Sequence, residues 1–473
     1  MKWIINRWYC PGGYKEVLKI AIPLILSTGA WSIQHFVDRM FLTWYSEDAI
    51  AASMPAGMVN FAVLSFFIGT ASYVNTFVAQ YFGAKQLDKI GKAVWQGIYL
   101  SGIGMFVMFA CIPFAETLFH LAGHPQSIQK LEVQYFVILC YGSFFPIAAA
   151  ALSGFFSGLG KTWIVMWVNV AATILNIVLD YVMIFGNWGF SERGIEGAAI
   201  ATVLSGVLSF FLFLFLMLRK QYRQKYLTWI GRKFSIDLFK RLWKFGSPSG
   251  FQFFLDMVGF TIFVLLIGRI GRTELAASNI AFQINTLAFM PMMGFGIAVS
   301  VLVGQNIGNK NIKMAEFSTW SAAHLTFTYM ITISILYVLI PELFLMPFGL
   351  KADPVVFQKT MDYGIVLLKF IALYSVFDSL NIIFASAIKG AGDTKFVMYT
   401  AVILSWVIMV IPSYFSIVVF KWDLYAAWWF ATAYVIVLGF LFLFRFLQGK
   451  WKNMSVIEDS VEPPFGIAES ISQ

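Results

Sequence analysis

Long, unbroken apolar stretches dominate the sequence, and polar residues gather in short segments between them. A helix needs about 20 mostly apolar residues to cross a bilayer. The hydrophobicity of the stretches is continuous rather than alternating, which favours helices over the strands of a membrane barrel. The pattern predicts an all-α membrane protein with twelve transmembrane helices, at residues 17–43, 52–80, 93–118, 129–157, 163–186, 196–218, 245–268, 277–304, 317–342, 361–388, 395–420 and 424–447.

Composition supports a lipid environment for most of the surface. The 473 residues are 59% hydrophobic and only 12% charged, with a mean hydropathy of +0.77. Soluble domains carry about 25% charged residues, so this chain has roughly half the usual complement. The lipid bilayer is therefore the expected surrounding, and the protein is expected to be multi-pass.

The net charge of +9 could indicate nucleic acid, but its distribution argues against that partner. Lys and Arg gather before the first predicted helix, after the second, eighth and twelfth, and in the central loop 219–244. With an even number of helices between them, these segments fall on one side of the membrane, and the positive-inside rule makes that side cytoplasmic. We expect a cell (inner or plasma) membrane protein with both termini in the cytoplasm and no nucleic-acid partner.

An internal repeat divides the chain into two similar halves. A shift of 225 positions aligns AASMPAGMVN with AASNIAFQIN and VAQYFGAK with VGQNIGNK. A second shift, of 232 positions, aligns GLGKTWIVM with GAGDTKFVM. The residues matched in this way include Pro23 with Pro248, Gln80 with Gln305, Gly83 with Gly308, Lys85 with Lys310 and Gly158 with Gly390. Similar hydrophobic composition alone would not place Gly, Gln, Lys and Pro in register at the same helix ends.

The repeat predicts two six-helix bundles related by a pseudo-two-fold axis along the membrane normal, because six spans give both halves the same orientation. We expect an amino-terminal lobe at residues 1–225, a basic cytoplasmic linker at 226–244, a carboxy-terminal lobe at 245–450 and a polar, disordered cytoplasmic tail at 451–473. Two lobes that rock around a central cavity are typical of secondary transporters.

Four carboxylates lie inside the apolar helices, where an ionisable group is costly and marks function by default. In the first half, Asp180 ends a polar stripe at helical spacing with Asn176 and Thr173, which suits a proton or a hard cation such as Na⁺. Asp38 lies late in the first helix and could approach Asp180. Its neighbour Arg39 leaves a structural ion pair as an open alternative.

The second half carries the other two acids. Asp256 follows Gln252 by one helical turn, and no basic residue lies between Lys244 and Arg269 to accompany it. Asp378 shares a helix face with two polar residues, Tyr374 and Asn381. We interpret these residues as a cation or substrate site. Under the 225-position shift the two pairs of acids are not equivalent, so the lobes share a scaffold but are not expected to share a chemistry.

Several motifs together resemble the multidrug and toxic compound extrusion (MATE) family, most closely its NorM-like bacterial branch. They are FVDRMFLTWYSEDAIAA, VAQYFGAK, GLGKT, LNIVLDYVMIFG and GIEGAAIAT in the first half, and GSPSGFQFFLD, ELAASNIAFQI, VGQNIGNKN and FDSLNIIFASAIKGAGDTK in the second. The resemblance covers residues 15–447. It implies a monomeric twelve-helix antiporter that exports small organic cations in exchange for Na⁺ or H⁺, with no other cofactor.

The resemblance also implies two sites by motif position. It places Asp256, Asp378 and Tyr374 in a carboxy-terminal cation site, and Asp38, Asn176, Asp180 and Thr202 in an amino-terminal one. We further expect Asn381, Gln252 and Gln283 to belong to the carboxy-terminal site and Thr173 to the amino-terminal site. NorM-like proteins usually carry Glu where this chain has Asp256, and Thr where it has Arg39.

Two other classes of protein remain as alternatives. A lipid-linked oligosaccharide flippase of the same superfamily would also have paired bundles, but basic residues should line its cavity to hold phosphates. A membrane-embedded enzyme could use paired Asp residues, yet no nucleophile, metal motif or phosphate loop accompanies them here. The three cysteines are widely spaced, so neither disulfides nor a structural metal is expected. We predict a transporter and not an enzyme.

Overall fold

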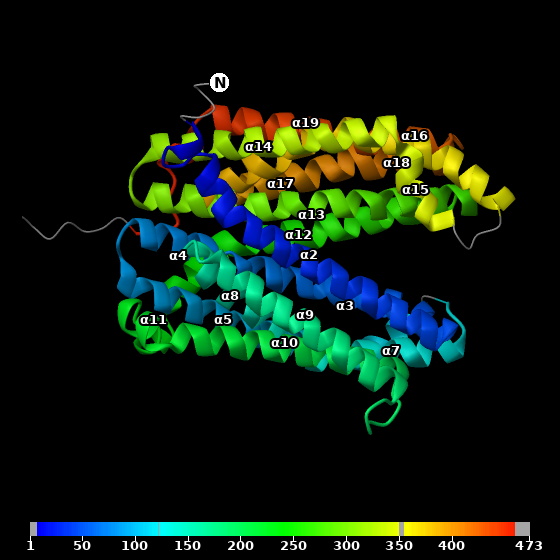
Figure 1. Ribbon diagram of the computed structural model, residues 1–473, viewed down its shortest axis with the longest axis horizontal. Helices are drawn as coiled ribbons and strands as arrows, with labels where there is room; N and C mark the ends of the chain where they lie inside the picture. The colour runs from blue at the N-terminus through cyan, green and yellow to red at the C-terminus, as the bar shows by residue number, and fades with distance from the viewer. Residues whose placement is uncertain (1–6, 122, 350–353, 459–473) are drawn as a thin grey trace, which may run out of the picture.

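The computed structural model describes residues 7–121, 123–349 and 354–458, and in this part of the chain the regular structure is helical (Figure 1). Eleven helices among the described residues are long and apolar enough to cross a membrane. A twelfth crossing is formed if the pair Gln126–Tyr141 and Phe144–Gly158, bent by 45°, counts as one span. The predicted number and positions of the spans agree with this arrangement.

The first six spans form one bundle, the amino-terminal lobe. Its helices are α2 (Tyr14–Tyr45), α3 (Glu47–Ser72), α4 (Val74–Gly83), α5 (Leu87–Cys111), α6 (Ala115–Leu121), α7 (Gln126–Tyr141), α8 (Phe144–Gly158), α9 (Thr162–Phe185) and α10 (Gly194–Leu218). Helix α2 packs against α9, α9 against α10, and α5 against α8. The short helix α11 (Lys220–Lys225) and the turn η2 (Ile230–Arg232) follow and lead to the second bundle.

The second bundle, the carboxy-terminal lobe, begins within the region that the sequence suggests as a linker, because its first helix starts at Ile236. The helices are α12 (Ile236–Gly268), α13 (Arg272–Gly308), α14 (Ile312–Leu339), α15 (Pro341–Gly349), α16 (Pro354–Ala391), α17 (Thr394–Leu404), α18 (Ile411–Tyr414) and α19 (Leu424–Leu447). Two π-helical segments, η3 (Ser405–Val410) and η4 (Phe415–Val419), flank α18 and complete its span. A final turn, η5 (Lys450–Asn453), follows α19.

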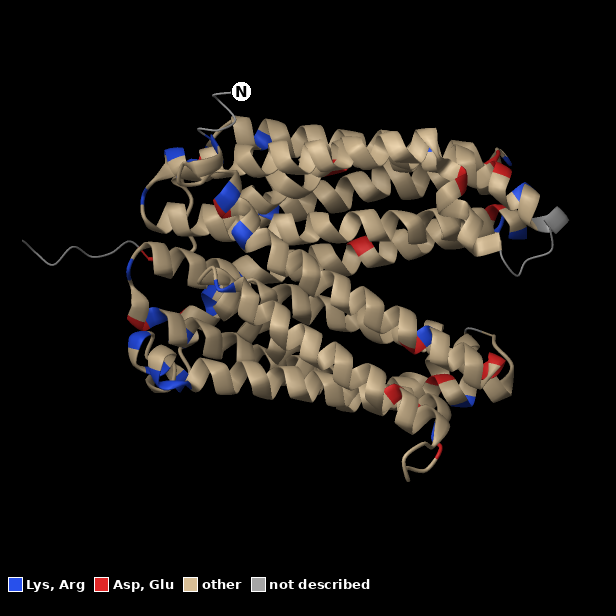
Figure 2. Cartoon of the chain, in the orientation of Figure 1, with Lys and Arg blue, Asp and Glu red and all other residues tan. Residues whose placement is uncertain are grey.

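Lys and Arg residues gather at one end of the molecule, where α11 and the α4–α5 and α13–α14 turns lie (Figure 2). We call this the basic end. A single hydrophobic core joins both lobes there and includes Phe77 of α4 and Phe295 of α13. Toward the other end each lobe has a core of its own, one around Phe41 and Phe136 and one around Trp428. The helices of the two lobes diverge in that direction (Figure 1).

Residues matched by the internal repeat hold the lobes together at the basic end. The Nε2 atom of Gln80 donates to the carbonyl oxygen of Gly390 at 2.9 Å, and Nε2 of Gln305 donates to that of Gly158 at 2.8 Å. Each bond runs from one lobe to the other, so the pair obeys the pseudo-two-fold symmetry.

Two further repeat-matched residues are glycines for a steric reason. A Cβ atom at Gly83 would lie 1.9 Å from the carbonyl oxygen of Gln305, and one at Gly308 would lie 2.0 Å from that of Gln80. Only residues without a side chain allow two helices to approach this closely. The repeat thus preserves the contact surface between the lobes as well as their folds.

Candidate functional site

Asp378 forms the centre of a polar group in the carboxy-terminal lobe. It lies on α16 and is 8% exposed, and its Oδ1 atom accepts a hydrogen bond of 2.9 Å from Nδ2 of Asn381, one turn along the helix. Tyr374, one turn before it, is also buried and lies within reach of its charge. The helical face predicted from the sequence therefore exists in the structure.

Asp256 approaches the same group from α12. Gln252 lies within hydrogen-bonding reach of its carboxylate, one turn earlier on the helix. The phenol of Tyr434, on α19, lies within electrostatic range of both Asp256 and Asp378. Tyr434 thus connects the acid on α12 electrostatically with the acid on α16.

A basic side chain accompanies Asp256 after all. The ammonium group of Lys389, on α16, is the charged group that acts on this carboxylate, although the two form no ion pair among the described residues. The sequence pattern shows only that no basic residue lies between Lys244 and Arg269 on the same helix, and it does not reveal that α16 supplies one. Gln283, by contrast, is exposed on α13, and its side chain has no hydrogen bond among the described residues.

The acids of the amino-terminal lobe form a second, drier group. Asp38 on α2 is 8% exposed, and Asp180 on the adjacent helix α9 is 0% exposed. The charge of Asp38 acts on Asp180, and both charges act on Tyr135 of α7, so the three side chains are close together. The expected approach of the two carboxylates is therefore present.

Five buried side-chain atoms of the two acids and of Asn176, on α9, have no hydrogen-bond partner within the described residues. They are Oδ1 of Asp38, both carboxylate oxygens of Asp180, and Oδ1 and Nδ2 of Asn176, which is 0% exposed. A buried oxygen without a partner is costly, and two buried carboxylates cannot both remain ionised and unpaired. The arrangement can take up a proton, or it can offer several oxygen ligands to a hard cation such as Na⁺.

The structural ion pair between Asp38 and Arg39 is absent from the part of the chain that the structure describes. Arg39 is exposed whereas Asp38 is buried, because consecutive residues of a helix point in different directions. The two threonines of the predicted site form no hydrogen bond with the acids among the described residues. Thr173 donates to Oε1 of Gln34 at 3.4 Å, and Thr202 has no side-chain bond to the acids among the described residues.

Sequence reasoning missed three members of these groups: Tyr135, Lys389 and Tyr434. Tyr135 and Tyr434 are phenols within apolar helices, which is a weak signal because tyrosine is an ordinary membrane residue. Lys389 lies two residues before the end of α16 and resembles a helix-end lysine in sequence. Their roles depend on how the helices are rotated against one another.

The fold and the two groups of buried acids define a polytopic membrane protein with two repeated lobes. Comparison with known proteins identifies its family. The MatE family model matches residues 23–182 and 248–415, which are one segment in each lobe and together more than half of the chain. The chain therefore belongs to the MatE family, and it is a transporter rather than an enzyme.

Curated relatives match along almost the whole chain. It is 25% identical to a probable multidrug resistance protein NorM of Thermotoga maritima over 447 residues, 94% of each chain. It is 26% identical to a protein of the same name from Neisseria meningitidis serogroup B, over 90% of this chain and 92% of the relative. These similarities support membership of the NorM-like branch.

Solved structures share the fold. One, described as the outward-facing conformation of a multidrug resistance MATE family transporter, matches with a TM-score of 0.84 at 19% identity, over 96% of this chain and 99% of that one. A MOP superfamily transporter from Pyrococcus furiosus matches with a TM-score of 0.83 at 19% identity, over 95% and 98%. The eukaryotic MATE transporter AtDTX14 matches with a TM-score of 0.82 at 20% identity, over 93% and 96%.

Proposed function

We propose that this transporter exports small organic cations, including drugs, in exchange for Na⁺ or H⁺. The observation that carries the proposal is the pair formed by Asp38 and Asp180, in which Oδ1 of Asp38 and both oxygens of Asp180 have no hydrogen-bond partner among the described residues. A dry pair of carboxylates binds a small cation or a proton reversibly, since uptake removes an unfavourable negative charge. The ion that enters down its gradient would bind there.

The organic cation would use the carboxy-terminal group. Asp256 and Asp378 supply negative charge, and the phenols of Tyr374 and Tyr434 supply aromatic surface beside it. A cation is attracted both to a carboxylate and to the face of an aromatic ring. The ion site and the substrate site would then lie in different lobes. Binding of the coupling ion in one lobe could change how the two lobes are arranged, and this change would release the organic cation from the other lobe.

Rocking of the lobes would couple the two events. The positive-inside rule assigns the basic end to the cytoplasm. In the present structure the lobes share a core at that end and diverge at the other, which supports a conformation open toward the outside. Separation at the basic end would then be needed to admit the next substrate. The chain would work as a monomer in the cell membrane.

Efflux from cells tests this proposal. Cells that express the protein should expel ethidium, and Asp180→Asn should abolish this efflux although the protein still reaches the membrane. Asp362→Asn is the matched control, because Asp362 is an exposed acid on α16 whose carboxylate accepts a hydrogen bond of 3.1 Å from Gln358. Wild-type efflux by Asp180→Asn would contradict the assignment of the ion site.

One observation favours the alternative, a lipid-linked oligosaccharide flippase. Lys389 lies close enough to Asp256 for their charges to interact, so the carboxy-terminal group is not purely acidic. A phosphate would need such a basic side chain. Translocation of a fluorescent lipid-linked oligosaccharide in proteoliposomes that show no ethidium transport would support the flippase and overturn the antiporter.

A further inference from the structure

The first residues of the carboxy-terminal tail are ordered and packed, although the sequence predicts a polar, disordered tail over 451–473. Residues 459–473 lie outside the described residues. Trp451 is 0% exposed and stacks on Phe446 of α19, and Lys452 forms an ion pair of 2.7 Å with Glu316 of α14. These contacts fix the start of the tail to the carboxy-terminal lobe.

The next residues, Met454–Glu458, cross to the other lobe, and we call them the tail strap. Val456 is 0% exposed and Ile457 is 9% exposed, so the strap is not a loose surface segment. Oε1 of Gln80, on α4 of the amino-terminal lobe, accepts hydrogen bonds from Oγ of Ser455 at 3.0 Å and from the backbone N–H of Val456 at 2.9 Å.

The strap thereby breaks the symmetry of the contact between the lobes. Gln80 uses its Nε2 atom to bond Gly390 of the opposite lobe and its oxygen to bond the strap. Its repeat-matched counterpart Gln305 makes only the bond to Gly158 among the described residues. Among the described residues, one half of a symmetric connection is therefore reinforced by the strap, whereas the Gln305 side chain has no second bond.

Glu458, the last described residue, also connects both lobes. Its carboxylate lies 2.9 Å from Nζ of Lys89 on α5 and 2.8 Å from a guanidinium nitrogen of Arg241 on α12. Arg241 further donates to the carbonyl oxygen of Val456 at 2.5 Å. Tyr81 of α4 is another titratable group within range of this carboxylate.

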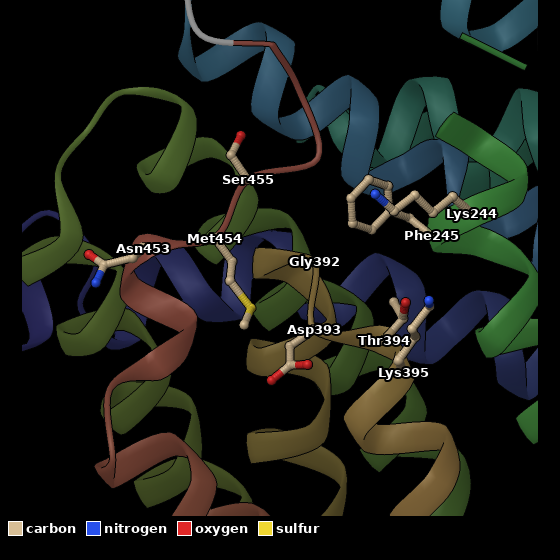
Figure 3. Close-up of a pocket in the computed structure, with 9 residues that line it drawn as sticks. All are labelled: Lys244, Phe245, Gly392, Asp393, Thr394, Lys395, Asn453, Met454 and Ser455. Carbon is tan, nitrogen blue, oxygen red and sulfur yellow. The ribbon is translucent and has the colours of Figure 1, made fainter. Parts of the chain in front are cut away.

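The charge of Glu458 persists at neutral pH. The hydrogen bond from Lys89, together with the charges of Lys89 and Arg241, holds the pKa of its carboxyl below the ordinary value of 4.5. Figure 3 shows the neighbouring part of the strap, where Met454 and Ser455 lie beside Gly392 and Asp393, at the turn between α16 and α17.

We propose that the tail strap is a latch that holds the two lobes together at the basic end and must leave Gln80 and Lys89 before the lobes can separate there. The inference rests on the proposed rocking motion. Each of its contacts with the amino-terminal lobe would break when that lobe moves away, whereas its anchor at Trp451 and Lys452 would persist.

Exposure of a buried residue between the lobes tests the latch without any transport. Thr76 of α4 is 2% exposed, and its Oγ1 atom lies 3.5 Å from Oγ of Ser300 across the interface. In full-length protein with Cys10, Cys111 and Cys140 replaced by Ser, Thr76→Cys reports opening at the basic end through its rate of labelling by a maleimide.

The comparison is between an acid of the strap and an exposed acid outside it. Glu458→Gln should raise the labelling rate roughly two- to five-fold, the range expected for exposed ion pairs. Asp362→Asn removes an exposed acid of α16 that does not contact the strap and should leave the rate unchanged. Equal labelling of Glu458→Gln and its parent, or an equal rise in both variants, would overturn the latch. This result stands whether or not the protein exports drugs.

A reversible tether tests whether the latch must release. Gln80→Cys with Ser455→Cys, joined by a short reducible cross-linker, should stop transport, and reductant should restore it. The control joins Glu316→Cys to Lys452→Cys within one lobe and should transport in both states. Undiminished transport with a complete tether between positions 80 and 455 would overturn the latch.

Discussion

Replacing Asp180 by asparagine should stabilise the protein while removing its response to the coupling ion. Asp180 is 0% exposed, and neither of its oxygens has a partner among the described residues. An unsatisfied buried polar group costs about 1–3 kcal/mol. The amide has nearly the same shape and no charge, and its N–H group can donate to the unpartnered Oδ1 of Asp38.

The gain should be visible in thermal unfolding of the purified protein in detergent. For a unit of 150–250 residues, about the size of one lobe, 1 kcal/mol corresponds to roughly 2–4 °C, so we expect a rise of a few degrees. The wild type should also gain about 1.4 kcal/mol when the coupling ion is present at ten times its dissociation constant. Asp180→Asn should lose that ion-dependent gain, and the control Asp362→Asn should keep it.

Two results would refute this reasoning. One is a lower unfolding temperature for Asp180→Asn, which would mean that the carboxylate has stabilising partners. The other is an unchanged response to Na⁺ and to H⁺, measured over the same concentration range as the wild type, which would remove Asp180 from the ion site.

Three further outcomes are expected. Asp378→Asn should abolish ethidium efflux in cells without changing the amount of protein in the membrane, because the organic cation loses its carboxylate; wild-type efflux would exclude this role. Gly308→Ala should destabilise the closed basic end by about 1–3 kcal/mol, since the added Cβ atom meets the carbonyl oxygen of Gln80 at 2.0 Å, and should raise labelling of Thr76→Cys. Gly102→Ala has open space around its Cβ position and should leave the labelling rate unchanged. Maleimides react with the thiolate, so each labelling rate is divided by that of a free cysteine at the same pH. The normalised rate should be constant between pH 6 and 8 and rise only as acid brings the pH below the ordinary pKa of 4.5 and through the lowered pKa of Glu458, because a depressed pKa stabilises the latch above that range; a normalised rise near neutral pH would contradict the assignment to this carboxyl.

The spans and the repeat could be predicted from the sequence because each depends on a local pattern. A run of apolar residues must be helical in lipid, whatever its neighbours are. The repeat placed Gln80 opposite Gln305 and Gly83 opposite Gly308 in the alignment. It could not show that these residues meet across the lobes, since that depends on how two bundles dock.

The candidate sites were only partly readable for the same reason. Asp38 and Arg39 are adjacent in sequence, and their separation into a buried and an exposed side chain depends on the rotation of α2 in its bundle. Lys389 reaches Asp256 from a helix more than a hundred residues further along the chain. The polarity of residues 451–473 predicts a disordered tail. Val456 and Ile457 nevertheless pack between the lobes, and two apolar residues in a row are too few to predict this packing from the sequence.

Transport driven by one gradient at a time tests the central claim most directly. Moving one charge across ~100 mV is worth about 2.3 kcal/mol, enough for a roughly fifty-fold gradient, so a coupled antiporter should move cations measurably uphill. Purified protein in liposomes should exchange ethidium against an imposed gradient of Na⁺ or of H⁺, and Asp180→Asn should not. Ethidium movement that neither gradient affects, or equal exchange by Asp180→Asn, would contradict the proposal that the buried acids couple export to an ion.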